Sequence, residues 1–255
     1  MVSTTTIIAA ILMAVLGFAA GLPGCLILNR IPAKWLCDYD EEPSEELKSG
    51  KRYVFKKHGL IMGASLAVAF AASVMTNGLS AELFIAVVIF FVLALVAASD
   101  AKYTIIPDQF TIAVAVFAIA FAVTDLLTTK SFVSKWYEPL IGAAAGAGFL
   151  VLLDLFSMFV LKKEGFGFGD IKLLAALGVM LGWKYVLVMI VLASFIAAIH
   201  FLVLIFAGDD IGKEGKYLPM GPYLCIAAAA TVVSRPWFES LFAMYKAVLE
   251  MDTLP

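Results

Sequence analysis

Glu164-Gly165-Phe166-Gly167-Phe168-Gly169-Asp170-Ile171-Lys172 is a short stretch between two segments that are apolar enough to cross a membrane. A carboxylate at a membrane boundary is costly to keep charged, so such acids usually mark chemistry or transport. Gly167 and Gly169 lack the side chains that would keep another backbone from approaching. The stretch therefore predicts membrane helices on both sides and a functional carboxylate, Asp170, between them.

The composition is that of a membrane protein. Of the 255 residues, 63% are hydrophobic and 15% are charged, whereas about 25% are charged in soluble domains. Apolar runs of about 17 to 25 residues can cross a bilayer as helices. We therefore expect an all-α, polytopic membrane helical bundle of about eight transmembrane helices, which lie near residues 7–28, 59–76, 82–99, 109–127, 139–161, 171–183, 185–207 and 219–234.

The charges of the loops predict the orientation. With the N-terminus outside, 13 of the 18 basic residues fall in cytoplasmic segments, which is the bias that membrane proteins show. Asp100 ends the third predicted helix and Asp170 begins the sixth, so both face the cytoplasm. The net charge of −2 gives no reason to expect a nucleic-acid partner, and membrane lipid is the expected surroundings.

Two aspartates at one membrane face can act together. If Asp100 and Asp170 lie a few ångströms apart, they cannot both ionise easily, and the pair holds one proton. One carboxylate can then take a proton from water while the other hydrogen-bonds a peptide carbonyl, as in aspartic proteases. Taken singly, each could instead cap a helix. For Asp108, which stands beside a predicted helix start, capping is the preferred interpretation.

Three sequence blocks resemble a known family. They are Asp100 with Pro107-Asp108 and Thr111, the stretch from Lys163 to Gly178 with Gly167, Gly169, Asp170 and Lys172, and Leu218-Pro219-Met220-Gly221-Pro222. With the weaker block Gly21…Arg30-Ile31-Pro32, they resemble, in order, the type IV prepilin peptidases, which are intramembrane aspartic proteases of the GxGD class. A lone GxGD would be a weak signal, but the ordered set spans nearly the whole chain.

The resemblance implies a function and a site. Such enzymes remove the short basic leader of type IV prepilins and pseudopilins, after a glycine, at the cytoplasmic face of the inner membrane. By position, Asp100 and Asp170 would be the catalytic pair. Residues 59–234 would form the peptidase domain, and residues 1–58 would be a reduced counterpart of the family's methyltransferase region. The tail 235–255 has the spacing of an amphipathic helix on the membrane surface.

The sequence departs from many bacterial members in its cytoplasmic loop. Those members N-methylate the product with S-adenosylmethionine and carry two CxxC pairs that bind zinc, whereas here the loop is about 30 residues long and holds only Cys37. We therefore expect proteolysis without a cofactor and no zinc. Methylation is not favoured, although S-adenosylmethionine remains open. The loop's acidic residues could attract a basic leader or form a solvated connector: Asp38, Asp40, Glu41, Glu42, Glu45 and Glu46.

Other intramembrane polar residues fit no block. Asp154 and His200 are expected to partner another helix, and Asp125, near an outer helix end, is expected to reach water. Glycines 142, 146 and 148 predict close helix packing. The competing functions are another GxGD intramembrane protease and a proton- or cation-coupled transporter. Other GxGD proteases have a tyrosine before the partner aspartate, whereas Ser99 precedes Asp100 here, which argues against the first. The lack of an inverted repeat argues against the second. The oligomeric state stays open.

Overall fold

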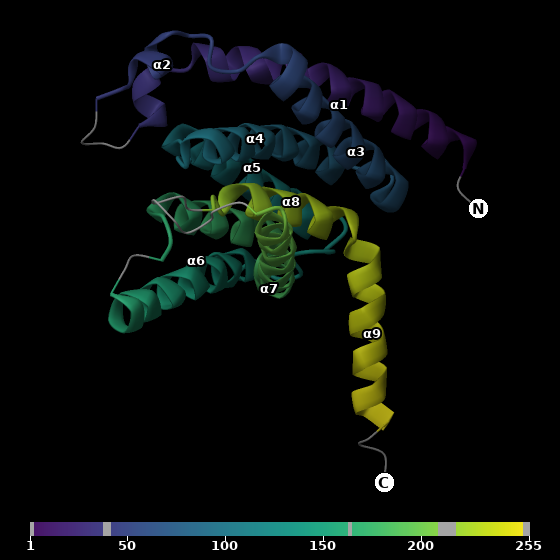
Figure 1. Ribbon diagram of the computed structural model, residues 1–255. Helices are drawn as coiled ribbons and strands as arrows, with labels where there is room; N and C mark the ends of the chain where they lie inside the picture. The colour runs from purple at the N-terminus through teal and green to yellow at the C-terminus, as the bar shows by residue number, and fades with distance from the viewer. Residues whose placement is uncertain (1–2, 38–41, 163–164, 209–217, 252–255) are drawn as a thin grey trace.

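The protein is an all-helical membrane bundle. A computed structural model describes residues 3–37, 42–162, 165–208 and 218–251, and these residues form helices and turns without a strand. The elements are α1 (Thr4–Arg30), η1 (Ala33–Leu36), α2 (Glu45–Lys48), η2 (Phe55–Gly59), α3 (Leu60–Asn77), α4 (Ala81–Tyr103), α5 (Asp108–Leu127), α6 (Glu138–Phe156), η3 (Ser157–Leu161), α7 (Phe168–Phe206), α8 (Gly221–Val233) and α9 (Arg235–Met251) (Figure 1).

Six helices in the described part of the chain are long and apolar enough to cross a membrane, where the sequence predicted about eight spans. All eight predicted segments are helical, but two of them, 171–183 and 185–207, are joined in the 39-residue α7. The predicted span at 219–234 contains α8, which has only 13 residues. At 1.5 Å per residue α8 is about 20 Å long, shorter than the roughly 30 Å hydrocarbon core.

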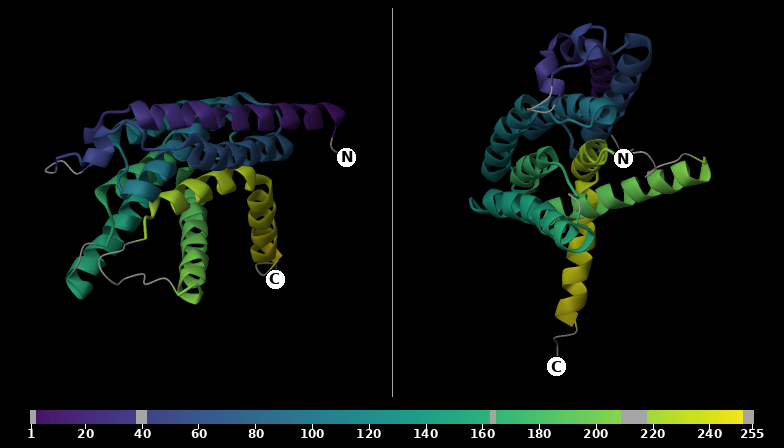
Figure 2. Two further views of the ribbon diagram at one scale, coloured as in Figure 1. Left: turned by 45° about the horizontal axis from the view of Figure 1, so that its top comes forward. Right: turned by 60° about the vertical axis from the view of Figure 1, so that its left-hand side comes forward.

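α7 breaks at Gly182, which explains why it resembles two spans in the sequence. Gly182 has φ 68° and ψ 173°, a conformation that side chains disfavour. A Cβ placed on Gly182 would lie 3.0 Å from the Phe132 carbonyl oxygen, so a neighbouring loop also requires the glycine. Beyond this break the second half of α7 extends away from the other helices, as α9 does (Figure 2).

Small residues bring neighbouring helices into backbone contact. A Cβ at Gly142 of α6 would overlap the Gly178 carbonyl oxygen of α7, and a Cβ at Gly178 would overlap the Gly142 carbonyl. Gly146 likewise faces the Leu174 backbone, at 2.7 Å from its would-be Cβ, but Gly148 meets nothing within 4 Å. The predicted close packing is thus confirmed for two of the three glycines. In a membrane such close approach supplies the van der Waals contact that holds helices together.

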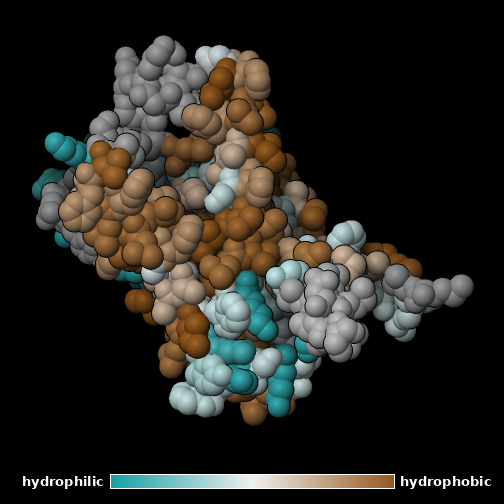
Figure 3. Space-filling model, turned by 90° about the horizontal axis from the view of Figure 1, so that it is seen from below, coloured by the Kyte–Doolittle hydropathy of each residue, from teal (hydrophilic) through white to brown (hydrophobic). Residues whose placement is uncertain are grey.

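Apolar side chains cover much of the outer surface. Ile11, Val68, Phe159 and Phe206 are more than half exposed, and apolar residues dominate large parts of the face in Figure 3. In water such a surface would be unfavourable, whereas lipid tails solvate it. The chain is therefore a multi-pass membrane protein, and the division at residues 58 and 234 stays a prediction.

Candidate active site

Asp100 stands in the last turn of α4 and is only 5% exposed. Its backbone carbonyl accepts the Thr104 N–H at 2.8 Å. Thr104 has a left-handed conformation (φ 55°) and ends the helix. The chain then turns through Ile106 and Pro107 into α5, so that the first sequence block wraps around its own carboxylate.

The Asp100 carboxylate is held by the N-terminus of α8. The Gly221 N–H donates to Asp100 Oδ2 at 2.8 Å. Gly221 is the first residue of α8, and Pro222 follows it in the first turn, where its missing N–H is not needed. A helix N-terminus favours a negative charge. The Pro-x-Gly-Pro block therefore supplies a backbone donor to an acid that precedes it by 121 residues.

Asp170 lies in the first turn of α7, after Gly167 at the N-cap position. It is half-buried, and its Oδ1 is buried without a hydrogen-bond partner among the residues that the structure describes. A Cβ on Gly169 would lie 3.1 Å from the Ile106 Cβ. The start of α7 therefore packs directly against the turn that follows Asp100, which joins the first and second sequence blocks.

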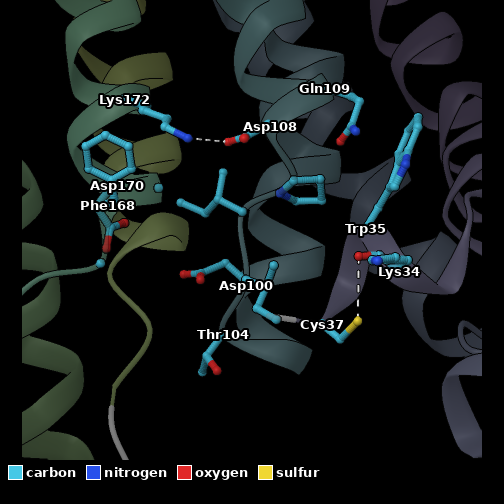
Figure 4. Close-up of a pocket in the computed structure, with 15 residues that line it drawn as sticks. Lys34, Trp35, Cys37, Asp100, Thr104, Asp108, Gln109, Phe168, Asp170 and Lys172 are labelled. Atoms are coloured by element: carbon cyan, nitrogen blue, oxygen red, sulfur yellow. Dashed lines mark hydrogen bonds and ion pairs between the residues drawn. The ribbon is translucent and has the colours of Figure 1, made fainter. Parts of the chain in front are cut away.

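Asp100 and Asp170 line one cavity and interact electrostatically. The cavity has a volume of about 480 Å³, and both carboxylates are at its wall (Figure 4). The blocks that the sequence analysis singled out therefore meet, and their predicted acids share an environment. The lining residues are Lys34, Trp35, Cys37, Asp100, Thr104, Ile105, Ile106, Pro107, Asp108, Gln109, Gly167, Phe168, Gly169, Asp170 and Lys172.

Asp108 has a different role from the predicted one. The N-cap residue of α5 is Pro107, and Asp108 is the first residue of the helix. Its carboxylate forms an ion pair with Lys172, with 2.7 Å between Oδ1 and Nζ (Figure 4). The capping interpretation was wrong because the partner comes from α7, 64 residues away. The pair ties the first block to the second beside the cavity.

The match that decides the family covers residues 87–202, which fit the model of the type IV leader peptidase family. This part of the chain belongs to the type IV leader peptidases. The matched region includes both acids of the cavity and the Asp108–Lys172 pair, whereas Gly221 lies beyond it.

Curated relatives carry the name prepilin leader peptidase/N-methyltransferase. The protein is 41% identical to one from Aeromonas salmonicida (strain A449) over 113 residues, which are 43% of this chain and 37% of the relative. It is 35% identical to one from Aeromonas hydrophila over 162 residues (63% and 51%). It is 30% identical to one from Bacillus subtilis (strain 168) over 176 residues (69% and 64%). The chain thus spans roughly a third to two thirds of these relatives. No solved structure matches it.

The segment between α1 and α3 supplies a wall of the cavity that sequence reasoning missed. Lys34, Trp35 and Cys37, in and beside η1, line the cavity opposite α7 (Figure 4). The only signal in the sequence was the nearby block Arg30-Ile31-Pro32. Its spacing resembles that of the family, but it does not indicate which residues the segment contacts. The segment expected to be a reduced methyltransferase region is therefore also part of the cavity.

Arg52 anchors this segment. Its side chain is 5% exposed, and it donates to the Leu47 carbonyl at 2.7 Å and to the Ile31 carbonyl at 2.8 Å. Next to it, Tyr53 donates from its hydroxyl to the Ala98 carbonyl of α4 at 3.0 Å. Burial raises the pKa of Tyr53, so the hydroxyl keeps the proton that it donates. The loop is therefore fixed to the end of the Asp100 helix.

The predicted acidic surface is only partly described. Asp38, Asp40 and Glu41 lie outside the described residues, and Glu42 is exposed. Glu45 pairs with Lys48, and Glu46 pairs with Lys102, each at 2.9 Å. These ion pairs offset part of the negative charge that the sequence suggested for attracting a basic peptide.

The remaining polar predictions have mixed outcomes. His200 Nδ1 lies 2.5 Å from the Tyr223 hydroxyl of α8, which confirms a partner on another helix. Asp154 instead accepts backbone N–H groups from the loop before α7. Asp125 does not reach water: it is fully buried and accepts from the Phe132 and Val133 amides at 3.0 and 2.8 Å.

The described residues bring no set of zinc ligands together. Among the described residues, no group of three or more His, Cys, Asp or Glu side chains could hold a metal ion. Cys37, which lies in the loop, donates from Sγ to the Lys34 carbonyl at 3.6 Å. Cys25 and Cys225 are buried in other elements, so the three cysteines do not supply a tetrahedral set of ligands.

Proposed function

We propose that the protein is an aspartic-type intramembrane endopeptidase that uses Asp100 and Asp170 to remove the leader peptides of type IV prepilins or pseudopilins. The observation that carries the proposal is the meeting of these two acids at one cavity, in a region of the type IV leader peptidase family. The names of the relatives support the class of substrate.

The surroundings of the two acids support different roles. Asp100 receives the Gly221 N–H at a helix N-terminus, which stabilises its ionised form. The Asp170 carboxylate has a backbone hydrogen bond with Gly167, but its Oδ1 atom is buried without a partner among the described residues, and it lies close to the charge of Asp100. We therefore propose that Asp100 is the general base and that Asp170 carries the shared proton. Asp100 takes a proton from water, and the resulting hydroxide attacks the peptide carbonyl while Asp170 donates to its oxygen.

Collapse of the tetrahedral intermediate breaks the C–N bond. The leaving amine takes the proton that Asp100 accepted, and Asp170 regains its own from the carbonyl oxygen, so both acids return to their starting states. The chemistry requires water, and the cavity of about 480 Å³ has room for it beside a peptide backbone. Each proton thus moves between groups that line the cavity.

The proposal includes a location. The excess of basic residues in the loops that the topology assigns to the cytoplasm supports an N-terminus outside and a cavity facing the cytoplasm in the inner membrane. A short basic leader, cut after a glycine, would then reach the acids from the cytoplasmic side. Asp100 lies in the last turn of α4 and Asp170 in the first turn of α7, so both would face the cytoplasm in this topology.

Co-expression with a prepilin from the same organism tests the function. Mass spectrometry of the prepilin N-terminus should detect loss of the leader with the intact protein. With Asp100→Asn or Asp170→Asn, cleavage should fall by orders of magnitude, because each change removes an ionisable group while keeping its volume. Glu239→Gln, on α9, should cleave normally. Near-normal cleavage by either Asn variant would remove that acid from the catalytic pair.

A further inference from the structure

Asp154 holds the loop that leads to Asp170. It lies in the last turn of α6 and is half-buried. Its Oδ1 accepts the Gly165 N–H at 2.8 Å and the Phe166 N–H at 3.2 Å. Two consecutive amides on one carboxylate oxygen fix both the position and the direction of the backbone at that point, because hydrogen bonds to a charged acceptor are the stronger ones.

Packing supports the same placement. A Cβ on Gly165 would lie 2.9 Å from the Ser157 Cβ and 3.0 Å from its Oγ. Ser157 is buried at the junction of α6 and η3, so this loop residue has no room for a side chain. Phe166 packs against the core. Close contact and hydrogen bonds therefore hold residues 165 and 166 on the end of α6.

The position of Asp170 depends on this short path. Gly167 directly follows the held residues, and its carbonyl accepts the Asp170 N–H at 3.1 Å as α7 begins. Asp170 Oδ1 has no hydrogen-bond partner of its own in the described part of the chain. The backbone, rather than side-chain partners on that oxygen, therefore sets where the carboxylate points.

We propose that Asp154 is a positioning residue for Asp170: by binding the Gly165 and Phe166 amides, it fixes the start of α7 and with it the carboxylate at the cavity. The effect on catalysis rests on the proposed function. A displacement of about 1 Å at a reacting group can cost about 100-fold in rate. Loss of Asp154 should therefore act on turnover more than on substrate binding or on folding.

Three variants of the full-length protein in detergent test the proposal. Asp154→Ala removes the acceptor, whereas Asp154→Asn keeps an oxygen that can accept. The matched control is Glu138→Ala, because Glu138 lies on the same helix and accepts the Ser134 N–H at 2.6 Å, but at the opposite end of α6. Measured quantities are kcat and KM on a purified prepilin, the melting temperature, and hydrogen–deuterium exchange of a peptide covering residues 165–172.

With Asp154→Ala, we expect kcat to fall about 10- to 100-fold, KM to stay within about two-fold, and exchange over 165–172 to speed up. Asp154→Asn should recover most of kcat, and Glu138→Ala should leave kcat and that exchange unchanged. Wild-type kcat and exchange in Asp154→Ala would overturn the proposal. It would also fail if the Ala variant lost kcat only together with melting temperature, without recovery by Asn.

Asp170→Asn, measured alongside, separates this inference from the proposed function. If Asp170→Asn cleaves as well as the wild type, the catalytic pair is wrong, and Asp154 cannot act on catalysis through it. The exchange measurement still decides whether Asp154 holds the loop, because it needs no substrate. Faster exchange in Asp154→Ala supports the structural part of the inference, and unchanged exchange overturns that part as well.

Discussion

The backbone amide of Gly221 and the carboxylate of Asp100 lie within hydrogen-bond distance, with 2.8 Å between N and Oδ2. A Cβ on Gly221 would lie 2.6 Å from the same oxygen and 3.0 Å from the Asp100 carboxyl carbon. The two residues are thus packed so closely that a methyl group at the start of α8 would displace the Asp100 carboxylate. The Pro-x-Gly-Pro block therefore helps to fix the position of the acid in the first sequence block.

Gly221→Ala should lower cleavage by about 100-fold or more, because the added methyl group displaces the proposed base. The protein should still accumulate in the membrane, since the rest of α8 is unchanged. Gly148→Ala is the matched control: a Cβ there meets nothing within 4 Å, and it should cleave as the wild type does. Comparing cleaved prepilin at equal protein levels measures the effect. Full activity in Gly221→Ala would show that the close contact is not needed for catalysis.

The Asp108–Lys172 pair should contribute modestly. Both side chains are one-third exposed, and exposed ion pairs contribute about 0.2–1 kcal/mol. Asp108→Asn should therefore reduce kcat/KM only about two- to five-fold, far less than Asp100→Asn. In a double-mutant cycle with Lys172→Met, the double variant should be little worse than either single one. Strictly additive losses would show that the two residues act separately.

The acidic segment should affect substrate binding. If it attracts a basic leader, changing Asp38, Asp40, Glu41 and Glu42 together to their amides should raise KM and leave kcat almost unchanged. Higher salt should reduce the difference between variant and wild type, because exposed charges are screened beyond about 8–10 Å. Lys48→Met removes the partner of Glu45 and should, if anything, lower KM. An unaltered KM in the neutralised protein would assign the segment a connecting role.

The cleaved product should carry no added methyl group. The segment between α1 and α3 contains no CxxC pair, and a small domain without a metal or disulfide staple rarely forms a rigid pocket alone. Mass spectrometry of mature prepilin from cells that contain this protein gives the measurement, with a strain lacking it as the control. A product heavier by one methyl group, formed only with this protein and S-adenosylmethionine, would contradict the expectation.

Local pattern was enough to predict the long helices and to place Asp100 and Asp170 at helix ends, because both follow from signals within one segment. Apolar length indicated every long helix, and the Gly-rich stretch indicated Asp170. The sequence predicts a boundary between two spans, 171–183 and 185–207, close to the break at Gly182. In the structure, one residue with φ 68° changes the direction of the chain without a loop.

Contacts between distant residues could not be predicted in this way. The partner of Asp108 comes from α7, and the amides around Asp125 come from a loop whose conformation the sequence does not indicate. Trp35 lines the cavity, and the nearby end of α1 is held by Arg52, a residue further along the chain. Each of these depends on how helices pack in three dimensions, whereas periodicity and composition describe one segment at a time.

The donor to Asp100 comes late in synthesis. A chain is made from its N-terminus, so α4 with Asp100 enters the membrane well before α8. The closely packed α6 and α7 are neighbours in sequence and can pair as soon as both have emerged, which sets Asp170 in place. The Asp100 carboxylate, however, lacks the Gly221 N–H donor until α8 has been made. We expect that a chain halted on the ribosome before residue 221 contains both acids but lacks the N–H donor to Asp100. Cleavage by the nascent protein should therefore begin only after α8 has been made.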